Sequence, residues 1–545
     1  MEKCLKILIW LSLATLTGSI ILLSLVPPVA RDALVHHLAV PKLYVKHGGI
    51  YEIPFMIYSY YPMNIDLLYM ISLYFGNDII PNFIHFTFSI LTSWIIYWHL
   101  KDRLNIIFAL FGALFFLSIP IIIKLSITAY VDLGLVFFST ASIIFIFKWI
   151  EKQFNIKYLI ISGCLCGIAL GIKYNALIIL FILTMFVAFI YSKFNSGEKL
   201  KTAKSIWFSF VFFSLALTLF SPWMIRNYIW KKNPIFPLYH SFFVSNNNLL
   251  SFSNVKKNFD PENNSKLGLF AYRKLIYNET PLQIASIPIR IFFEGKDGEI
   301  ASFKYFDGKL NPFLLFFPIL AFYKKKMIFG YEKWILLCFI ILFFLFAFLT
   351  SVVRIRYICP ILPPLVILSV YGIKNAFDIL KKGVFYNLLF ILVAFSIVIN
   401  FKYLLEQFDY VNPFNYLNKS ITRDEYIEQY CPEYPSINYI NKNLSENTNT
   451  MFLFIGKRGY YCNRAYLPES ENMFSEIIKK NDNCQKILNG FKKAGVSHLL
   501  INIDFFNEWA KDIFSMEEQK KVQNLLNNYA KLLYIKNRIG VLSLI

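Results

Sequence analysis

An aspartate follows the first apolar segment of the chain, and two histidines come shortly after it. Residues 7–26 form an uncharged run about as long as a bilayer crossing requires, so Asp32 emerges at the membrane surface. A carboxylate at the rim of a membrane can act as general base toward a lipid-borne substrate. His36 and His37 are adjacent, and adjacent residues on a helix point to different sides. At most one of them is therefore expected to contact a substrate.

Further polar side chains occur where other apolar segments are predicted to reach the same side of the membrane. They are Lys42, Asp132, Lys173, Arg226, Arg354, Arg356 and Tyr357. Fixed cations can stabilise the charge that builds on a phosphate leaving group, and the arginine fork matches phosphate geometry. Two carboxylates and several cations therefore predict group transfer from a membrane-anchored phosphate donor.

Simpler roles stay open for most of these side chains. Arginines at helix ends can extend toward the interface without any ligand, which would account for Arg226, Arg354 and Arg356. Asp132 could cap the helix that it begins. Lys173 is harder to explain in this way, because it lies between two apolar segments with almost no loop.

The composition places the chain among the polytopic membrane proteins. Of 545 residues, 57% are hydrophobic and only 16% are charged, whereas a soluble chain has about a quarter charged residues. The net charge of +21 lies in loop clusters, which is typical of cytoplasmic loops and anionic-lipid contact rather than nucleic-acid binding. Cys431, Cys462 and Cys484 allow one disulfide in the C-terminal region, with no pairing determined.

About eleven apolar segments predict a bundle of membrane-spanning helices. The first is a retained anchor rather than a signal peptide, because it is long and no small-residue cleavage site follows it. The others lie near residues 81–100, 104–123, 133–147, 158–172, 174–192, 205–225, 311–323, 334–353, 357–373 and 384–401.

Basic clusters fall on alternate turns between these segments, and the positive-inside rule places those turns in the cytoplasm. The clusters lie at residues 101–103, 148–157, 193–204, 324–326 and 374–382. The remaining turns then face outward, and two of them, about 27–80 and 226–310, are long enough to carry function. The tyrosine-rich run at 58–62 could be either an interfacial belt or a platform for a sugar.

Two domains are predicted from these patterns. Residues 1–405 form the membrane domain. After about residue 411 the long apolar runs stop, and short strand patterns alternate with amphipathic helix patterns. Residues 411–545 are therefore expected to form a small extracytoplasmic α/β domain. Within it, Gly456–Gly459 follows a strand but lacks the Walker spacing, which favours a plain turn over a nucleotide site.

Several motifs, taken together and in order, resemble the GT-C membrane glycosyltransferases, in the group similar to protein O-mannosyltransferases and the lipid A aminoarabinose transferase. They are Asp32–Lys42, Tyr130–Leu133, Gly171–Tyr174, Ser221–Asn227, Asn233–Pro237 and Arg356–Pro360. The resemblance implies a GT-C fold, a polyprenyl-phosphate sugar donor and inversion at the anomeric carbon. It also implies that Asp32 is the catalytic aspartate and that Arg226 contacts the donor phosphate. Many members carry Asp-Glu where this chain has Asp32 and Ala33.

We therefore expect a hexosyl- or pentosyltransferase of the cytoplasmic membrane, with Asp32 as general base. Asp132 is expected to orient the acceptor or to help hold a metal. No cofactor follows from the residues; a divalent metal, if used, would be held by Asp32 and Asp132. The expected partners are a polyprenyl-phosphate sugar donor, a glycan, lipid or protein acceptor, and membrane lipids, but not nucleic acid. Substrate contacts are expected from His36 or His37, Lys42, Lys173, Arg226, Arg354, Arg356 and Tyr357.

Two other functions fit the same charges. The chain could be a transporter or flippase of lipid-linked saccharide, or a membrane protein that binds glycolipid without catalysis. Transporters usually hold their ionisable groups near the middle of the membrane, whereas here these groups are predicted to gather at one face. That placement favours an enzyme.

Overall fold

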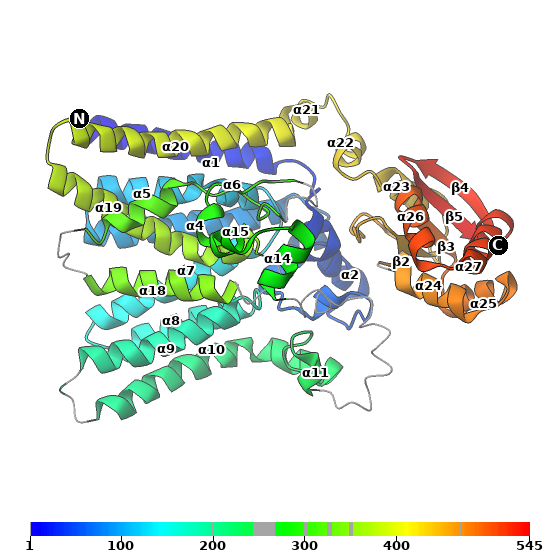
Figure 1. Ribbon diagram of the computed structural model, residues 1–545, viewed down its shortest axis with the longest axis horizontal. Helices are drawn as coiled ribbons and strands as arrows, with labels where there is room; N and C mark the ends of the chain where they lie inside the picture. Colours follow the sequence, from blue (N-terminus) through cyan, green and yellow to red (C-terminus); the bar gives the residue numbers. More distant parts are fainter. Residues whose placement is uncertain are drawn as a thin grey trace.

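The computed structural model describes residues 2–195, 197, 200–243, 268–298, 304–323, 330–347, 353–468 and 470–545. Figure 1 shows a bundle of long helices, with an α/β domain beyond one of its ends. The predicted basic cluster at 324–326 lies outside the described residues, as do parts of the stretches 193–204 and 226–310.

The bundle consists of apolar helices, and every apolar segment predicted from the sequence falls at least partly on one of them. They are α1 (Glu2–Ser24), α4 (Ile80–Arg103), α5 (Ile106–Ser118), α6 (Pro120–Ser126), α7 (Asp132–Glu151), α8 (Ile156–Leu170), α9 (Ala176–Phe194), α10 (Lys201–Lys231), α17 (Phe313–Leu320), α18 (Gly330–Ala347), α19 (Leu362–Leu380) and α20 (Val384–Val411). Six helical segments among the described residues are long and apolar enough to cross a membrane, or seven if α5 and α6 count as one bent span. The protein is thus a helical integral membrane protein, whereas the predicted number of eleven spans is not confirmed.

Proline and glycine set two local features of the bundle. Pro120 begins α6, which is bent by 66° from α5, because proline cannot donate the backbone hydrogen bond that would continue the helix. In α8, Gly163 and Gly167 lie one turn apart against α10, where a Cβ on Gly167 would come within 2.7 Å of the Ala216 carbonyl oxygen. Small residues at this spacing let the two helices approach closely.

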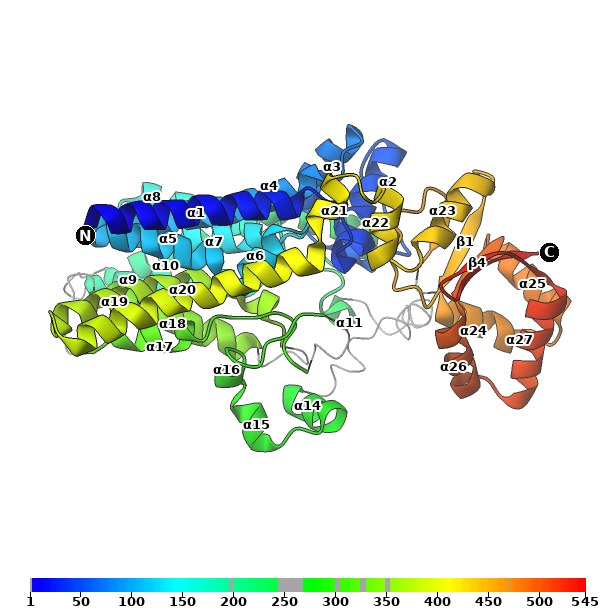
Figure 2. The same ribbon diagram turned by 90° about the horizontal axis from the view of Figure 1, so that it is seen from above.

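The outer segment predicted at 27–80 folds into short helices at the end of the bundle that faces the α/β domain (Figure 2). It contains the π-helix η1 (Ala33–His37), α2 (Ala39–His47), the 3₁₀ turn η2 (Ile57–Tyr60) and α3 (Asn64–Tyr74). Gly48 ends α2 with a φ of 82°, a conformation that glycine adopts without strain. A π-helix is rare and often marks a functional site, and this one begins directly after Asp32.

The second long outer segment carries short helices as well. These are α11 (His240–Phe243), α14 (Leu269–Tyr277), α15 (Pro281–Ala285) and α16 (Ile287–Arg290). Further along, the 3₁₀ turn η5 (Ile355–Ile361) leads into α19.

The C-terminal part is an α/β domain built on one mixed sheet, in the strand order β2-β1-β3-β5-β4. Strands β2 and β3 pair parallel to β1, and β5 pairs antiparallel to both β3 and β4. The strands are β1 (Asn449–Leu453), β2 (Ala465–Leu467), β3 (His498–Asn502), β4 (Ala530–Lys536) and β5 (Ile539–Leu544). The helices are α21 (Pro413–Leu417), α22 (Arg423–Tyr430), α23 (Tyr434–Asn443), α24 (Glu471–Lys480), α25 (Cys484–Lys493), α26 (Ile503–Ile513) and α27 (Met516–Asn528).

Each face of the sheet has its own core, as the two-residue period of a strand requires. Met451 and Leu453 of β1 pack with α24, α25 and α27 on one face. Phe452, between them, packs with Ile437 and Ile440 of α23 on the other face. Both faces are covered, so β1 is apolar along most of its length.

Candidate active site

Asp32 forms an ion pair at the bundle end that faces the α/β domain. Its Oδ2 lies 2.5 Å from Nη2 of Arg356 in η5, and the two side chains are 25% and 11% exposed. The backbone N–H of Asp32 donates to the Tyr130 hydroxyl over 3.4 Å. Burial alone would raise the pKa of Asp32, but the Arg356 guanidinium beside it holds that pKa well below its ordinary value. Asp32 is therefore an ionised carboxylate in this arrangement.

Three of the predicted cations lie around the ring of Tyr357. Nζ of Lys173 lies 4.9 Å from the ring centroid, and the guanidinium carbons of Arg356 and Arg354 lie 5.2 Å and 5.4 Å from it. Cations are attracted to the face of an aromatic ring at such distances. The structure thus brings Lys173, Arg354, Arg356 and Tyr357 together beside Asp32.

Asp132, at the start of α7, pairs with Lys173. Its Oδ1 lies 2.6 Å from the lysine Nζ, and the aspartate is only 2% exposed. Its Oδ2 is buried with no hydrogen-bond partner among the residues that the structure describes. Asp132 therefore fixes the Lys173 amine and keeps one oxygen available. Its expected role toward an acceptor stays a prediction.

A buried histidine of α4 holds the turn that precedes α7. Nε2 of His85 accepts a hydrogen bond from the Leu133 backbone N–H over 2.9 Å. This assigns the proton to Nδ1, which lies 2.8 Å from both the Leu125 and the Thr128 carbonyl oxygens. The imidazole thereby ties the end of α6 to the beginning of α7, and so helps to fix the position of Asp132.

The two histidines of η1 have separate surroundings. His37 lies 2.7 Å through Nδ1 from Oδ1 of Asp66, a carboxylate that is 2% exposed. His36 instead stacks on the ring of Tyr58, with centroids 4.5 Å apart, and its Nδ1 is buried without a hydrogen-bond partner among the described residues. Burial and the neighbouring His37 keep the pKa of His36 well below its usual range, so its imidazole is neutral.

Arg226 lies between two tryptophans near the C-terminal end of α10. Its guanidinium carbon is 4.5 Å from the Trp223 ring centroid and 5.0 Å from that of Trp230. Nη2 donates to the Tyr61 carbonyl oxygen over 3.1 Å, whereas Nη1 is buried and unpaired. Within the described ranges no carboxylate pairs with this arginine.

Tyr61 connects Arg226 to the group around Asp32. Its ring lies 5.6 Å from that of Tyr58, which stacks on His36, and 5.3 Å from that of Tyr174. Asn64, three residues later, donates its backbone N–H to the Gly171 carbonyl oxygen over 2.8 Å. A Cβ on Gly171 would lie only 2.1 Å from the Asn64 amide nitrogen, so a larger residue there would displace the Asn64 side chain. The turn that carries Lys173 is thereby attached to the first outer segment.

Lys42 lies away from this group and holds the α/β domain. Its amine donates to the Tyr460 carbonyl oxygen over 2.6 Å and to Oδ1 of Asn463 over 2.8 Å. The Tyr460 backbone N–H donates to the Leu34 carbonyl oxygen over 3.1 Å, and the Tyr461 hydroxyl donates to that of Pro28 over 2.7 Å. Residues 460–463 therefore contact the chain on both sides of Asp32.

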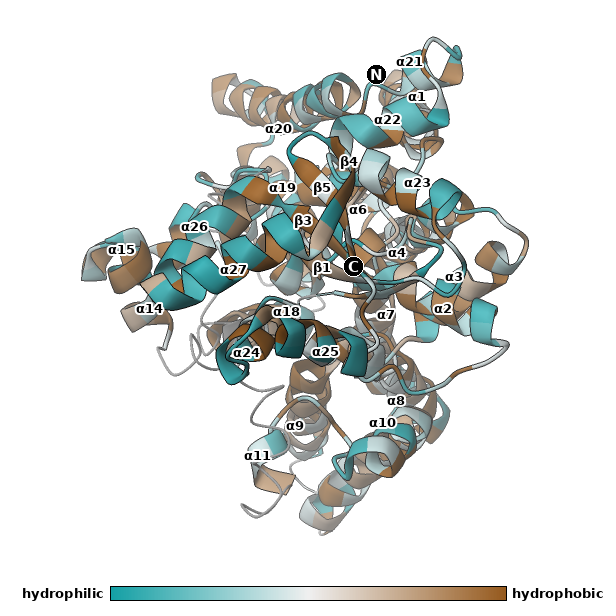
Figure 3. Ribbon diagram, turned by 90° about the vertical axis from the view of Figure 1, so that its right-hand side faces the viewer, coloured by the Kyte–Doolittle hydropathy of each residue, from teal (hydrophilic) through white to brown (hydrophobic). Residues whose placement is uncertain are grey.

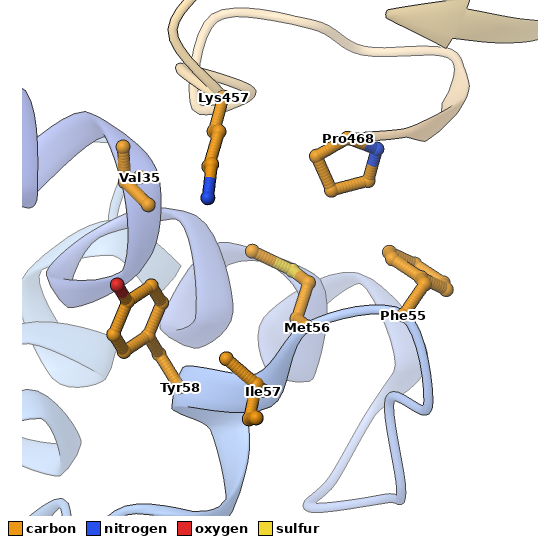
Figure 4. A pocket seen from close by; sticks show the side chains of 7 residues that line it. All are labelled: Val35, Phe55, Met56, Ile57, Tyr58, Lys457 and Pro468. Atoms are coloured by element: carbon orange, nitrogen blue, oxygen red, sulfur yellow. The ribbon is translucent and has the colours of Figure 1, made fainter. Parts of the chain in front are cut away.

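A small, open pocket lies between the first outer segment and the α/β domain (Figure 4). Val35 of η1 and residues 55–58 form one side, and Lys457 and Pro468 reach it from the other. Burial lowers the pKa of Lys457 to about 8, with Glu471 opposing the shift and Arg31 adding to it. The sequence Gly456–Gly459 thus presents one lysine to Val35 and Tyr58 of the first outer segment.

Both carboxylates predicted to hold a divalent metal are paired with a cation, Asp32 with Arg356 and Asp132 with Lys173. The described part of the chain contains no group of three or more histidine, cysteine, aspartate or glutamate side chains that could hold a metal ion. The use of a divalent metal stays a prediction.

Sequence reasoning missed four residues of this region: Asn64, Asp66, His85 and Lys457. An ionisable side chain within an apolar segment is a recognised signal, and His85 carries it. Asp66 and Asn64 had no such signal, because partners distant in the sequence give them their roles. Lys457 belonged to a motif that was interpreted as a plain turn rather than a nucleotide site.

Comparisons with known proteins identify similar sequences and folds. Residues 67–225 match the model of the family described as dolichyl-phosphate-mannose-protein mannosyltransferase. No curated protein sequence matches the chain. The structure is similar to that of ArnT from Cupriavidus metallidurans in the apo state, with a TM-score of 0.57, 11% identity, and coverage of 98% of this chain and 97% of that one.

Two ligand-bound structures are also similar. ArnT from the same organism bound to undecaprenyl phosphate has a TM-score of 0.56, 12% identity, and coverage of 98% and 97%. The archaeal oligosaccharyltransferase AglB from Archaeoglobus fulgidus, in complex with an inhibitory peptide and a dolichol-phosphate, has a TM-score of 0.52, 12% identity, and coverage of 98% and 74%. The chain therefore has the GT-C fold that its motifs predicted, and residues 67–225 are similar to the protein mannosyltransferase family.

Proposed function

We propose that the protein transfers a sugar from a polyprenyl-phosphate donor to an acceptor hydroxyl at the outer face of the cytoplasmic membrane. One arrangement carries the proposal: an ionised carboxylate, Asp32, lies beside a group of cations, and a half-buried arginine nearby, Arg226, has a buried Nη1 without a partner among the described residues. Two similar structures support the choice of donor, because one binds undecaprenyl phosphate and the other a dolichol-phosphate.

The donor phosphate is assigned to the cations. A buried charge is costly unless it is paired, so Arg226, with no carboxylate partner among the described residues, favours a bound anion. The flanking Trp223 and Trp230 rings keep its fork in place. Lys173 and Arg356 supply two further cations around the Tyr357 ring. Together they would stabilise the negative charge that develops on the leaving phosphate.

Asp32 is assigned the role of base. The acceptor oxygen forms a bond to the anomeric carbon, while the bond from that carbon to the phosphate oxygen breaks. The acceptor proton passes to the Asp32 carboxylate, and the polyprenyl phosphate leaves with the electron pair. Attack from the side opposite the phosphate inverts the anomeric configuration. The acceptor would approach from the side of the pocket below Lys457, because Tyr58, which lines that pocket, stacks on His36.

The test uses the full-length chain in a strain that lacks its own copy. We expect Asp32→Asn to remove one product from the mass-spectrometric profile of surface glycolipids, glycans and glycoproteins. Purified Asp32→Asn protein should still bind undecaprenyl phosphate, whereas Arg226→Met should bind it at least tenfold more weakly. Arg538→Gln, at an exposed ion pair of the α/β domain, is the matched control for both measurements.

The outcomes separate the competing functions. An unchanged profile with folded, membrane-inserted Asp32→Asn protein would contradict catalysis and favour a transporter or a glycolipid-binding protein. Equal lipid binding by the wild type and Arg226→Met would contradict the assignment of the donor phosphate to this arginine.

A further inference from the structure

A small lobe projects from the side of the helix bundle, formed by α14, α15 and α16. Figure 2 shows it beside the bundle, near the end that faces the α/β domain, and Figure 3, along the bundle, shows α14 and α15 outside its outline. Its interior is an ion-pair group. Glu279 lies 2.5 Å from Nε of Arg273 and 3.0 Å from Nη2 of Arg290. Arg273 and Glu279 are only 1% and 4% exposed, so the lobe has a defined fold.

The outside of this lobe is apolar. Six large apolar side chains within residues 268–293 are more than half exposed. They are Phe270 at 53%, Leu275 at 67%, Ile276 at 56%, Leu282 at 79%, Ile289 at 55% and Phe293 at 53%. A small unit in water would bury such side chains and expose its charges. Charges inside and apolar groups outside are the arrangement expected of an element that contacts lipid.

The apolar surface continues onto the bundle. The ring of Phe293 lies 6.2 Å from that of Phe316 in α17. Phe316 is 50% exposed and Ile319, further along the same helix, is 63% exposed. These residues belong to an apolar helix of the membrane bundle, whose exposed side faces lipid. Lys274 and Lys296 add exposed cations that suit anionic headgroups.

We infer that residues 268–293 form an interfacial lipid-binding element, which lies in the headgroup region of the leaflet next to the candidate active site. The connection to that site is short. Arg273 donates to the Lys304 carbonyl oxygen over 2.8 Å, and the Ile355 backbone N–H donates to that of Phe306 over 2.8 Å. The lobe is thus anchored beside Arg356. This inference is independent of the proposed reaction.

The test is photo-crosslinking of the full-length protein in nanodiscs of phosphatidylcholine and phosphatidylglycerol. A lipid with a diazirine near the headgroup end of its acyl chain is activated, and its adducts are mapped by mass spectrometry. We expect peptides from 269–293 to be labelled as strongly as those from α17. Peptides from α27, where Met516 is 80% exposed, should stay at background. An unlabelled lobe beside a labelled α17 would overturn the inference.

A paired variant makes the test specific to the apolar side chains. Leu275→Ser with Leu282→Ser should lower lobe labelling at least threefold and leave α17 labelling unchanged. Met516→Ser with Leu532→Ser, two exposed positions of the α/β domain, is the matched control. Unchanged lobe labelling in a folded Leu275→Ser, Leu282→Ser protein would contradict the inference. If that variant fails to fold, the wild-type adduct map decides the question alone.

Discussion

The Asp132–Lys173 pair illustrates how a buried charge constrains the site at the scale of single residues. Replacing Lys173 by Met leaves the carboxylate of Asp132, which is 2% exposed, without its cation. We expect a loss of about 3–5 kcal/mol in the free energy of unfolding, as is usual when one partner of a buried ion pair is removed. Titration with denaturing detergent would measure it.

A double variant separates charge from packing. Asp132→Asn combined with Lys173→Met removes both charges, so part of the lost stability should return. Lys480→Met, at an exposed pair with Glu476, should change stability by less than about 1 kcal/mol. If the losses in free energy of unfolding caused by Asp132→Asn and by Lys173→Met simply added in the double variant, the two side chains would not be coupled.

Lys457 gives a prediction about pH. Its pKa is lowered from 10.5 to about 8, so its amine carries charge below about pH 8 and loses it above. If the charged amine helps to bind the acceptor, activity falls as the pH rises from 8 to 9. The free energy of unfolding instead rises with pH in this range. The reason is that between about pH 8 and 10.5 the unfolded chain binds more protons than the folded one. The pH profile of product formation, with thermal unfolding alongside, checks both signs.

Lys457→Arg is the matched variant for this profile, since arginine stays charged over the whole range. It should retain activity at pH 9. A wild-type profile that is flat between pH 7 and pH 9 would remove Lys457 from the acceptor site.

At the scale of elements, residues 460–463 hold the segment that carries Asp32. Tyr461 bonds to Pro28, and Tyr460 bonds to Leu34 and to the amine of Lys42. We expect Lys42→Met, and to a smaller extent Tyr461→Phe, to increase amide hydrogen exchange in residues 30–38. Each lost hydrogen bond costs about 0.5–1.5 kcal/mol, which is enough to raise local opening several-fold. Mass spectrometry of the exchanged peptides measures this.

Tyr439→Phe serves as the control for that measurement, because the Tyr439 ring stacks on Tyr534 in the α/β domain, away from the segment. Exchange in residues 30–38 that is the same in all three variants would show that the α/β domain does not hold Asp32 in place.

The sequence predicted these elements unevenly. The alternation of short strands and amphipathic helices after about residue 411 was predicted, because apolar periodicity is strong there. The three-residue β2 was missed, since so short a strand has no period to detect. The first outer segment was treated as a loop, yet it forms η1, α2, η2 and α3. Its helices depend on contacts with the bundle and the α/β domain rather than on local preference.

The same limit applies to the site. Asp32, Lys173, Arg226 and Arg356 could be selected from the sequence because charges at the ends of apolar segments are conspicuous. The pairing of Asp32 with Arg356 could not be predicted, because only the packing of the bundle brings these two residues together. The sequence also grouped Lys42 with the substrate contacts, whereas its amine is bound by the α/β domain.

At the scale of the whole molecule, the orientation in the membrane is open to a direct experiment. The positive-inside rule predicts that the α/β domain lies outside the cell and that the turn after α7 lies in the cytoplasm. Met516→Cys should react with a membrane-impermeant maleimide on intact cells, because Met516 is 80% exposed. Lys152→Cys should react only after permeabilisation, and the unsubstituted chain gives the background. The reverse pattern would contradict the predicted orientation.

The contact between Asp32 and Arg356 has a consequence for the order of events. A carboxylate paired with arginine is a weak base, and its pKa is held well below the usual value. An arriving phosphate would compete for the same guanidinium, and as Arg356 turns toward it the basicity of Asp32 would rise. Without a donor, the Asp32 carboxylate would stay paired with Arg356. Binding of the donor would thus have to precede catalysis. An acceptor or a water molecule that arrived before the donor would not be deprotonated by Asp32.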